Sequence, residues 1–285
     1  MATRVAPITD ADLDEVARFL HAEMNSDVPA AAWRRSFDTF DHPGPNHGFL
    51  LRDTEGDRLV GVYAAYYSTR VVRGEPVGVC NLGVWCVLPS HRLHSVRLLK
   101  ALVSQEGWSF VDLSPSGAVI PLNERLGFRF LDTTTALVPA LPWPWRPGSV
   151  SADPAVIEAT LTGADLALYR DHRHAAAARH LVLRRGDRHC YVVFRMDRRK
   201  GLPRVFATVL HVGDPELFAA MTRPLAGHLL LRHGALALLT ELRVVRRRPF
   251  GSILLGSSRR KMFRSPTLGA DDVDYFYSEL VSVSW

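Results

Sequence analysis

The run from residue 87 to residue 99 has residue types suited to binding a phosphate. It reads Val-Leu-Pro-Ser-His-Arg-Leu-His-Ser-Val-Arg-Leu-Leu, so an apolar strand end passes through a proline-containing turn into a helical pattern. The first turn of a helix has backbone N–H groups without intrahelical partners, and these groups attract phosphate. Arg92 and Arg97 add positive charge there. The run therefore predicts a phosphate-binding turn, although an ordinary solvated helix start has the same composition.

Two asparagines near this turn are candidates for the chemistry. Asn81 lies in the apolar strand pattern of residues 77–87, and Asn123 lies in the run Leu-Asn-Glu-Arg-Leu-Gly-Phe of residues 122–128. Strand alternation predicts that Asn81 points to the same side as Trp85, where it could orient an amine; a hydrogen-bonded structural role is the alternative. The amide of Asn123 can donate a hydrogen bond but cannot supply a proton.

Both runs resemble motifs of the GNAT superfamily of N-acyltransferases. The family's acyl-CoA loop reads Arg/Gln-x-x-Gly-x-Gly/Ala after a strand that ends Val-x-Pro. Arg92 takes its leading position, and Ser95 and Arg97 stand where the family has small residues. The run at residues 122–128 resembles the family's Leu-Tyr-x-x-x-Gly-Phe signature, with Asn123 in place of the tyrosine. The resemblance covers roughly residues 4–138.

This resemblance implies a phosphopantetheine thioester as the donor substrate. In the family, the strand before the loop binds the pantetheine arm and the tyrosine commonly protonates the leaving thiolate, so this chain needs water or another acid. The two histidines are expected as contacts only, and exposed histidines without a role are the alternative. The residues expected to contact the donor are Trp85, Cys86, Val87, His91, Arg92, Leu93, His94, Ser95, Val96 and Arg97.

The cysteines point away from metal and covalent chemistry. Cys80, Cys86 and Cys190 are too few for a disulfide framework, and none has the spacing of a zinc site. We expect them to be small buried hydrophobic residues, and we expect no metal site. Direct attack of an amine on the thioester requires no acylated cysteine.

Periodic patterns position these motifs in an α/β fold with mixed sheets. Residues 13–24 and a short stretch around Trp33 and Phe37 have helical spacing, and apolar runs at 49–52 and 59–67 predict a hairpin. The strand 77–87 then leads through the phosphate turn into a helix at 96–103. A strand at 108–113, a short helix at 121–126 and a strand at 128–138 complete the first half.

The second half repeats this order, which predicts two tandem GNAT-like domains, the second one degenerate. We expect a first domain at residues 1–138, a Pro/Trp-rich linker at 139–154 and a second domain at 155–285. The repeat has helices around 156–169, a hairpin at 181–194, a strand at 204–211, a helix at 215–233 and strands at 235–245 and 274–285.

The second domain is expected to support the first one rather than to catalyse a reaction. Its counterpart of the phosphate turn, residues 211–216, contains Asp214 and Glu216, whose carboxylates repel phosphate. Its last strand carries Glu279, a possible base for the acceptor, although a glutamate beside tyrosines is more often structural.

Charge and hydropathy limit the partners. Residues 1–150 hold 14 Lys and Arg against 16 Asp and Glu, whereas residues 151–285 hold 21 against 13. A basic half suits an acidic carrier protein, and its arginine runs also suit a solvated face; we do not expect a nucleic-acid partner. The start of the sequence lacks a signal-peptide pattern and no apolar stretch is long enough for a membrane span, so we expect a cytoplasmic protein without membrane contact.

The motifs together predict transfer of an acyl group from acyl-CoA or an acyl carrier protein to the amine of a small molecule. The amine attacks the thioester directly, with Asn81, Asn123 and Glu279 as the candidate catalytic residues. Two alternatives remain open at this point. The chain could be a non-catalytic sensor or scaffold that kept the fold, or a transferase that takes its acyl group from aminoacyl-tRNA.

Overall fold

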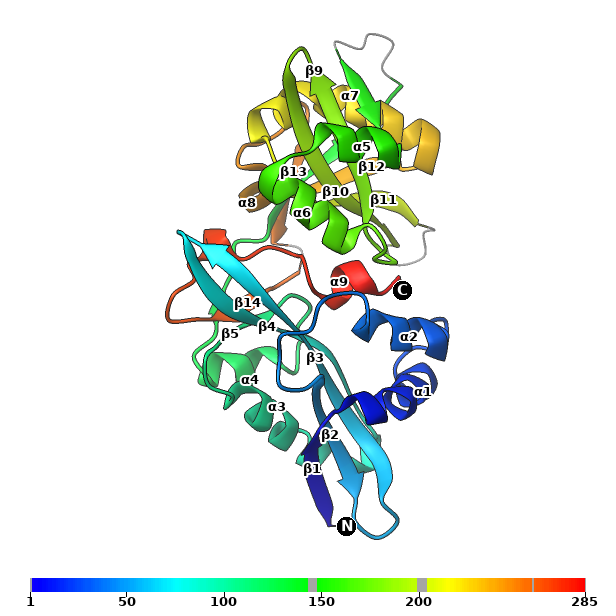
Figure 1. Cartoon of the computed structure of the whole chain (residues 1–285), viewed down its shortest axis with the longest axis vertical. Helices are drawn as coiled ribbons and strands as arrows, with labels where there is room; N and C mark the ends of the chain where they lie inside the picture. The colour runs from blue at the N-terminus through cyan, green and yellow to red at the C-terminus, as the bar shows by residue number, and fades with distance from the viewer. Residues whose placement is uncertain (1, 143–147, 199–203, 258, 285) are drawn as a thin grey trace. The chain divides into compact units, whose positions relative to one another are not determined.

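Two seven-stranded mixed sheets organise the chain (Figure 1). The structure is a computed structural model and describes residues 2–142, 148–198, 204–257 and 259–284. It divides into two compact units. The first unit comprises Met1–Leu131, Lys261–Val273 and Tyr277–Trp285, and the second comprises Asp132–Arg260 and Asp274–Phe276.

The first sheet has the order β1-β2-β3-β4-β5-β14-β6. Its neighbours are antiparallel except β4 and β5, which are parallel. The strands are β1 (Thr3–Pro7), β2 (Gly48–Asp53), β3 (Arg58–Val72), β4 (Glu75–Val87), β5 (Trp108–Asp112), β14 (Met262–Arg264) and β6 (Arg129–Phe130).

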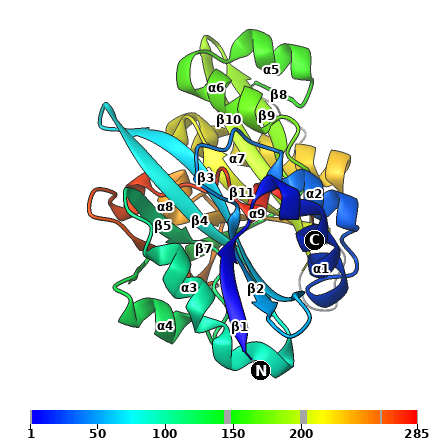
Figure 2. The same ribbon diagram turned by 60° about the horizontal axis from the view of Figure 1, so that its bottom comes forward.

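Helices cover both faces of this sheet (Figures 1 and 2). On one face lie α1 (Leu13–Glu23) and α2 (Ala30–Phe37), whose apolar side chains pack against Leu50, Val62 and Val84. On the other face lie α3 (Val96–Val103) and α4 (Ile120–Arg125), whose cluster includes Tyr63 and Leu82. The short helices of this unit are η1 (Asp10–Asp12), η2 (Pro89–His94), η3 (Ala270–Asp272) and α9 (Glu279–Ser282).

A bulge in β4 decides which side chains of this strand share a face. The pairing with β3 runs from Tyr63 opposite Trp85 to Ala65 opposite Leu82, so β4 has one extra residue at this point. Leu82 and Trp85 consequently contact the same core, the one under α3, although three positions separate them. The prediction that Asn81 points to the same side as Trp85 is therefore wrong, because the bulge interrupts the alternation.

Gly83 is part of this bulge and lies directly against an aromatic ring. A Cβ at Gly83 would stand 2.7 Å from Cε2 of Tyr66. Tyr66 is buried and its hydroxyl lies 3.1 Å from Oγ of Ser36 in α2, so the ring is held in place. The bulge therefore requires a residue without a side chain at this position.

The second sheet repeats the pattern of the first with the order β8-β9-β10-β11-β12-β7-β13. Here too the fourth and fifth strands, β11 and β12, form the parallel pair, and the other neighbours are antiparallel. The strands are β8 (Ser149–Ser151), β9 (Arg179–Arg185), β10 (Arg188–Arg198), β11 (Arg204–Val212), β12 (Ala237–Glu241), β7 (Thr134–Pro139) and β13 (Ile253–Ser257).

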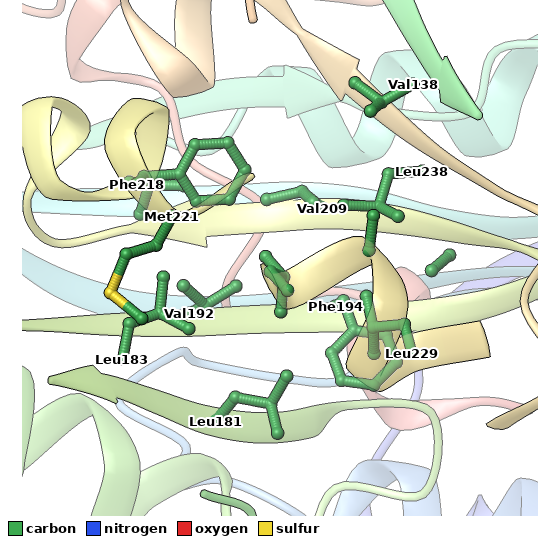
Figure 3. Packing of buried hydrophobic residues seen from close by; sticks show 14 of the residues in the cluster. Val138, Leu181, Leu183, Val192, Phe194, Val209, Phe218, Met221, Leu229 and Leu238 are labelled. Carbon is green, nitrogen blue, oxygen red and sulfur yellow. The ribbon is translucent and has the colours of Figure 1, made fainter. Parts of the chain in front are cut away.

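The core of the second unit forms under its long helix α7 (Pro215–His233) (Figure 3). Phe218, Met221 and Leu229 of this helix pack against the β9 and β10 side chains, which include Leu183 and Phe194. The remaining helices of the unit are α5 (Pro154–Thr160), α6 (Gly163–His172) and α8 (Leu242–Val245). The helix predicted at residues 215–233 is therefore confirmed.

The sixth strand of each sheet comes from the other half of the sequence. The strand predicted at 128–138 is divided into β6, in the first sheet, and β7, in the second, because Thr134 donates its N–H and its hydroxyl to Asp132 and forms a turn. In return, β14 enters the first sheet. The compact units consequently differ from the ranges 1–138 and 155–285, and Trp143 and Trp145 of the proposed linker lie outside the described residues.

Of two strand predictions near the C-terminal end, the first is confirmed in part and the second is wrong. The stretch 235–245 forms β12 and then turns into α8. Residues 274–285, predicted as one strand, contain instead the short helix α9, in which the backbone N–H of Val283 bonds to the carbonyl of Glu279. The hydroxyl of Ser282 also donates to the carbonyl of Ser278, one helical turn earlier. Glu279 therefore belongs to the first unit.

Replacing Gly83 tests the bulge. Gly83→Ala should lower the free energy of unfolding by about 1–3 kcal/mol, since the new methyl group must displace Tyr66 or the strand. Urea unfolding measures this change. Gly56→Ala is the matched control, because a Cβ there has open space around it; the control should be neutral or slightly stabilising. Equal effects of the two substitutions would show that the bulge does not need a glycine.

Candidate functional site

A cavity of about 680 Å³ opens in the first unit where β4 and β5 separate. The two strands pair from Gly78 opposite Trp108 to Asn81 opposite Val111, and β4 then continues to Val87. The wall is formed by the end of β4, the turn η2, the end of β5, the start of α4 and the end of α1. Residues that represent these elements are Trp85, Arg92, Asp112, Val119 and Met24.

Half of the predicted donor contacts line this cavity. They are Trp85, Cys86, Val87, Arg92 and Ser95. The indole of Trp85 stacks on the ring of Tyr63 with 4.5 Å between the ring centroids, which fixes one wall of the cavity. The strand end and the turn that the sequence singled out thus meet at one place.

The other predicted donor contacts lie away from the cavity wall. His91 is buried, with Nδ1 2.9 Å from the hydroxyl of Ser90 and Nε2 3.6 Å from Asp53. Arg97 donates from Nη1 to the carbonyl and the hydroxyl of Thr3 in β1, at 2.9 and 2.7 Å. Leu93, His94 and Val96 are absent from the lining, and Leu93 is 96% exposed.

The three predicted catalytic residues belong to one hydrogen-bond network. The amide of Asn81 donates to Oε2 of Glu279 at 2.6 Å. The hydroxyl of Ser114 donates to Oε1 of Glu279 at 2.6 Å, and its backbone N–H donates to Oδ1 of Asp112 at 3.3 Å. The amide of Asn123 donates to Oδ2 of Asp112 at 2.8 Å. A continuous chain therefore leads from Asn81 to Asn123.

The separation of the strands lets this network pass through the sheet. Glu279 is part of α9, which lies beside α2, whereas Asn123 is part of α4 on the opposite face. Ser114 follows β5 directly and contacts both carboxylates. Groups that a closed sheet would keep apart thus form one polar network, which is buried except at the exposed Ser114.

Burial sets the ionisation of the groups around the cavity. It raises the pKa of the Asp112 carboxyl to about 7; the Asn123 hydrogen bond opposes this shift and the negative charge of Glu279 adds to it. Burial and the charge of Asp112 raise the pKa of Tyr63 well above its ordinary value. Burial also raises the pKa of the Cys80 thiol, and that of the Cys86 thiol to about 11. Near neutral pH both thiols are therefore weak nucleophiles.

Asp112 and Ser114 were missed from the sequence. Asp112 ends an apolar strand that is buried on both faces, and a carboxylate in such a position signals either a structural pair or a functional group. This signal identifies Asp112 as a candidate from the sequence alone. The contact of Ser114 with Glu279 cannot be predicted in this way, because 165 positions separate the two residues along the chain.

The corresponding turn of the second unit is already filled by a carboxylate. Asp214 is the N-cap of α7 and accepts from the backbone N–H groups of Glu216 and Leu217. Arg188 pairs with Asp214 at 2.6 Å. The prediction that carboxylates occupy this turn is confirmed, and its first-turn amides have an internal acceptor.

The described part of the chain gives two further findings. It contains no group of three histidine, cysteine, aspartate or glutamate residues arranged as metal ligands. Among its helices, none is both long enough and apolar enough for a bilayer.

Comparison with known proteins identifies the fold. Neither a family model nor a curated protein matches the sequence. Solved structures do match, among them a GCN5-related N-acetyltransferase from Anabaena variabilis, with TM-score 0.57 and 11% identity over 92% of this chain and 72% of that one. A GCN5-related N-acetyltransferase from Kribbella flavida has TM-score 0.56 and 17% identity, over 92% and 72%.

A third match is the N-myristoyltransferase of Saccharomyces cerevisiae with bound myristoyl-CoA. It has TM-score 0.50 and 10% identity and covers 99% of this chain and 89% of that one. The chain thus has the fold of the GNAT N-acyltransferases, as its two motifs predicted.

The raised pKa of Asp112 has a measurable effect on stability. The unfolded chain ionises Asp112 near the ordinary value of 3.8, whereas the folded chain keeps it protonated up to about 7. The contribution of Asp112 to the free energy of unfolding is therefore complete at low pH and is lost progressively between these two values as the pH rises. The Asp112→Asn variant has no carboxyl group to ionise at this position. Its free energy of unfolding should therefore rise relative to that of the native chain by up to about 1.4 kcal/mol per pH unit across that window.

Urea unfolding at a series of pH values measures this difference. Glu106→Gln, which removes an exposed carboxylate of the same unit, is the control for the loss of a surface charge. A constant difference for Asp112→Asn would mean that Asp112 ionises normally in the folded chain.

Proposed function

We propose that the chain is an N-acyltransferase of the GNAT type. It moves an acyl group from a phosphopantetheine thioester to an amine by direct attack. The observation that carries this proposal is the cavity between β4 and β5, which has Arg92 and Ser95 at its turn and Asp112 in its wall. A cleft with a cation at one end and a proton-transferring group in its wall suits a thioester whose far end carries phosphate.

The donor is acyl-CoA or an acylated carrier protein. The pantetheine arm occupies the opening beside the end of β4, and the phosphate end lies at η2 near Arg92. The myristoyl-CoA bound to the yeast N-myristoyltransferase supports a CoA thioester. The family has small residues where this chain has Ser95 and Arg97, so the backbone of the turn leaves less room for a pyrophosphate. An acylated carrier protein, whose pantetheine arm carries a single phosphate, is therefore the alternative donor.

The amine attacks the thioester carbonyl without an acylated intermediate on the protein. Cys86 is the cysteine that lines the cavity among the described residues, and burial raises the pKa of its thiol to about 11. The amine attacks as the neutral base, because an ammonium ion has no lone pair for the carbonyl carbon. We infer a small-molecule amine as the acceptor.

The predicted catalytic residues act in this proposal through Asp112. Asn123 is fully buried and donates to Asp112, so it positions that carboxyl group. Asn81 and Glu279 are buried as well, and they hold Ser114 beside Asp112. The network thus orients the group that reaches the cavity.

A turnover assay tests the proposal. The chain is incubated with acetyl-CoA, longer acyl-CoA thioesters or an acylated carrier protein and a panel of amines, and free thiol is measured. Thiol release that depends on the amine is expected, and intact-protein mass spectrometry with donor alone should find no acyl adduct. An adduct would overturn direct attack. Binding of the donor without turnover would identify the non-catalytic alternative.

The position of Arg92 gives a prediction about affinity. Arg92→Ala should weaken CoA binding about tenfold or more, because a charge-assisted contact with phosphate contributes about 1.5–3 kcal/mol. Arg97→Ala is the matched control, since Arg97 is engaged with Thr3 and should change the affinity less than about twofold. Calorimetry or thermal shifts measure both values. A larger effect of Arg97→Ala than of Arg92→Ala would indicate that the phosphate binds on the Arg97 side of the turn.

A further inference from the structure

Expulsion of an alkyl thiolate creates a need for a proton inside the cavity. A thiol such as that of pantetheine has a pKa near that of cysteine, about 8.5, so its thiolate is a poor leaving group unless an acid protonates it. The described titratable residues of the cavity lining are Glu23, Tyr63, Cys86, Arg92 and Asp112.

Position and ionisation single out one of these groups. Arg92 lies in η2, where its guanidinium suits the phosphate end of the donor. Tyr63 and Cys86 hold their protons too tightly, because burial raises the pKa of both groups. Glu23 is exposed at the end of α1, outside the buried part of the cavity wall. Asp112 is 3% exposed, borders the cavity and has a pKa of about 7.

The hydrogen bonds of the network reach both of its carboxyl groups. Glu279 accepts bonds of 2.6 Å from Asn81 and from Ser114. Asp112 accepts one bond of 2.8 Å from Asn123 and a long one of 3.3 Å from the Ser114 N–H. At Asp112 the effect of burial, which favours the neutral carboxyl group, outweighs the effect of these bonds.

No cation among the described residues forms an ion pair with Asp112. The titratable groups that interact with it are Glu279 of α9 and Tyr63 of β3, and Cys80 of β4 interacts in turn with Tyr63. The element α4 contributes the neutral Asn123. The surroundings of Asp112 therefore favour its neutral, proton-donating form.

We propose that Asp112 is the acid that protonates the leaving thiolate, with Asn123 and Ser114 as its positioning residues. This inference rests on the proposed acyl transfer. The amine nitrogen adds to the thioester carbonyl, and the carbon–sulfur bond of the adduct then breaks while the sulfur takes the proton of the Asp112 carboxyl. The resulting carboxylate accepts the proton that the nitrogen loses on becoming an amide. One thioester and one amine thus give one amide and one thiol, and Asp112 returns to its starting form.

Two donors with the same acyl group and different thiols test this role. Acetyl-CoA releases an alkyl thiolate, whereas S-phenyl thioacetate releases an aryl thiolate of much lower basicity, which leaves without a proton. The bond-breaking rate is measured in single turnovers with the amine that supports the fastest reaction. Asp112→Asn should reduce the rate with acetyl-CoA by about 10²-fold or more and the rate with S-phenyl thioacetate by less than about fivefold. Glu106→Gln is the control and should alter neither rate.

A second measurement uses the unmodified chain and does not depend on the folding of a variant. The ratio of the acetyl-CoA rate to the S-phenyl thioacetate rate should fall as the pH rises from about 5.5 to about 8.5, with a midpoint near 7, because only the first reaction needs protonated Asp112. Ionisation of the amine affects both reactions equally and leaves this ratio unchanged.

The outcomes distinguish a failure of the proposed role of Asp112 from a failure of the proposed acyl transfer. Equal losses with the two donors in Asp112→Asn, or a rate ratio that is constant with pH, overturn the role of Asp112 and leave the acyl transfer intact. Failure of the unmodified chain to transfer an acyl group from either donor to any amine overturns both.

Discussion

The candidate site depends on the point at which two parallel strands stop pairing. β4 and β5 share hydrogen bonds as far as Asn81 and Val111, and beyond this point the backbone of β4 is held from the side of β3. A sheet that opened at its edge would not create a cavity; one that opens at its centre creates a slot with a wall on each side. The bulge at Gly83 accompanies this opening and turns Trp85 towards the α3 face. The cavity and the hydrogen-bond network from Asn81 to Asn123 both lie at this separation.

Two buried carboxyl groups are costly unless hydrogen bonds compensate for lost water. The first unit meets this requirement with neutral donors, namely two asparagines and a serine, and without an arginine at Asp112. An arginine would hold Asp112 permanently ionised. With neutral partners, burial raises the pKa of its carboxyl group to about 7.

The sequence predicted the fold better than the site. The turn at Arg92, the helix at 96–103 and the two hairpins follow from local spacing, and local spacing determined them in the structure. The exchange of β7 and β14 could not be predicted, because both strands are short and a pattern of apolar residues does not specify the partner sheet. For the site, Asn81 and Glu279 were chosen separately, and their contact across 198 positions needed the tertiary structure. Asp112 belongs to no motif, and its raised pKa results from its burial in the folded chain.

The reciprocal exchange of strands has a consequence for biosynthesis. A ribosome that has completed the first half of this chain has made β1 to β7, but neither β14 nor the carboxylate of Glu279. The gap beside β5 stays open and the polar groups of Asn81 and Ser114 stay without their acceptor until the last part of the sequence emerges. Contacts of such long sequence separation form late and slow the folding of a chain. A cut of the chain between its two halves would therefore separate β14 and Glu279 from the first sheet and β7 from the second.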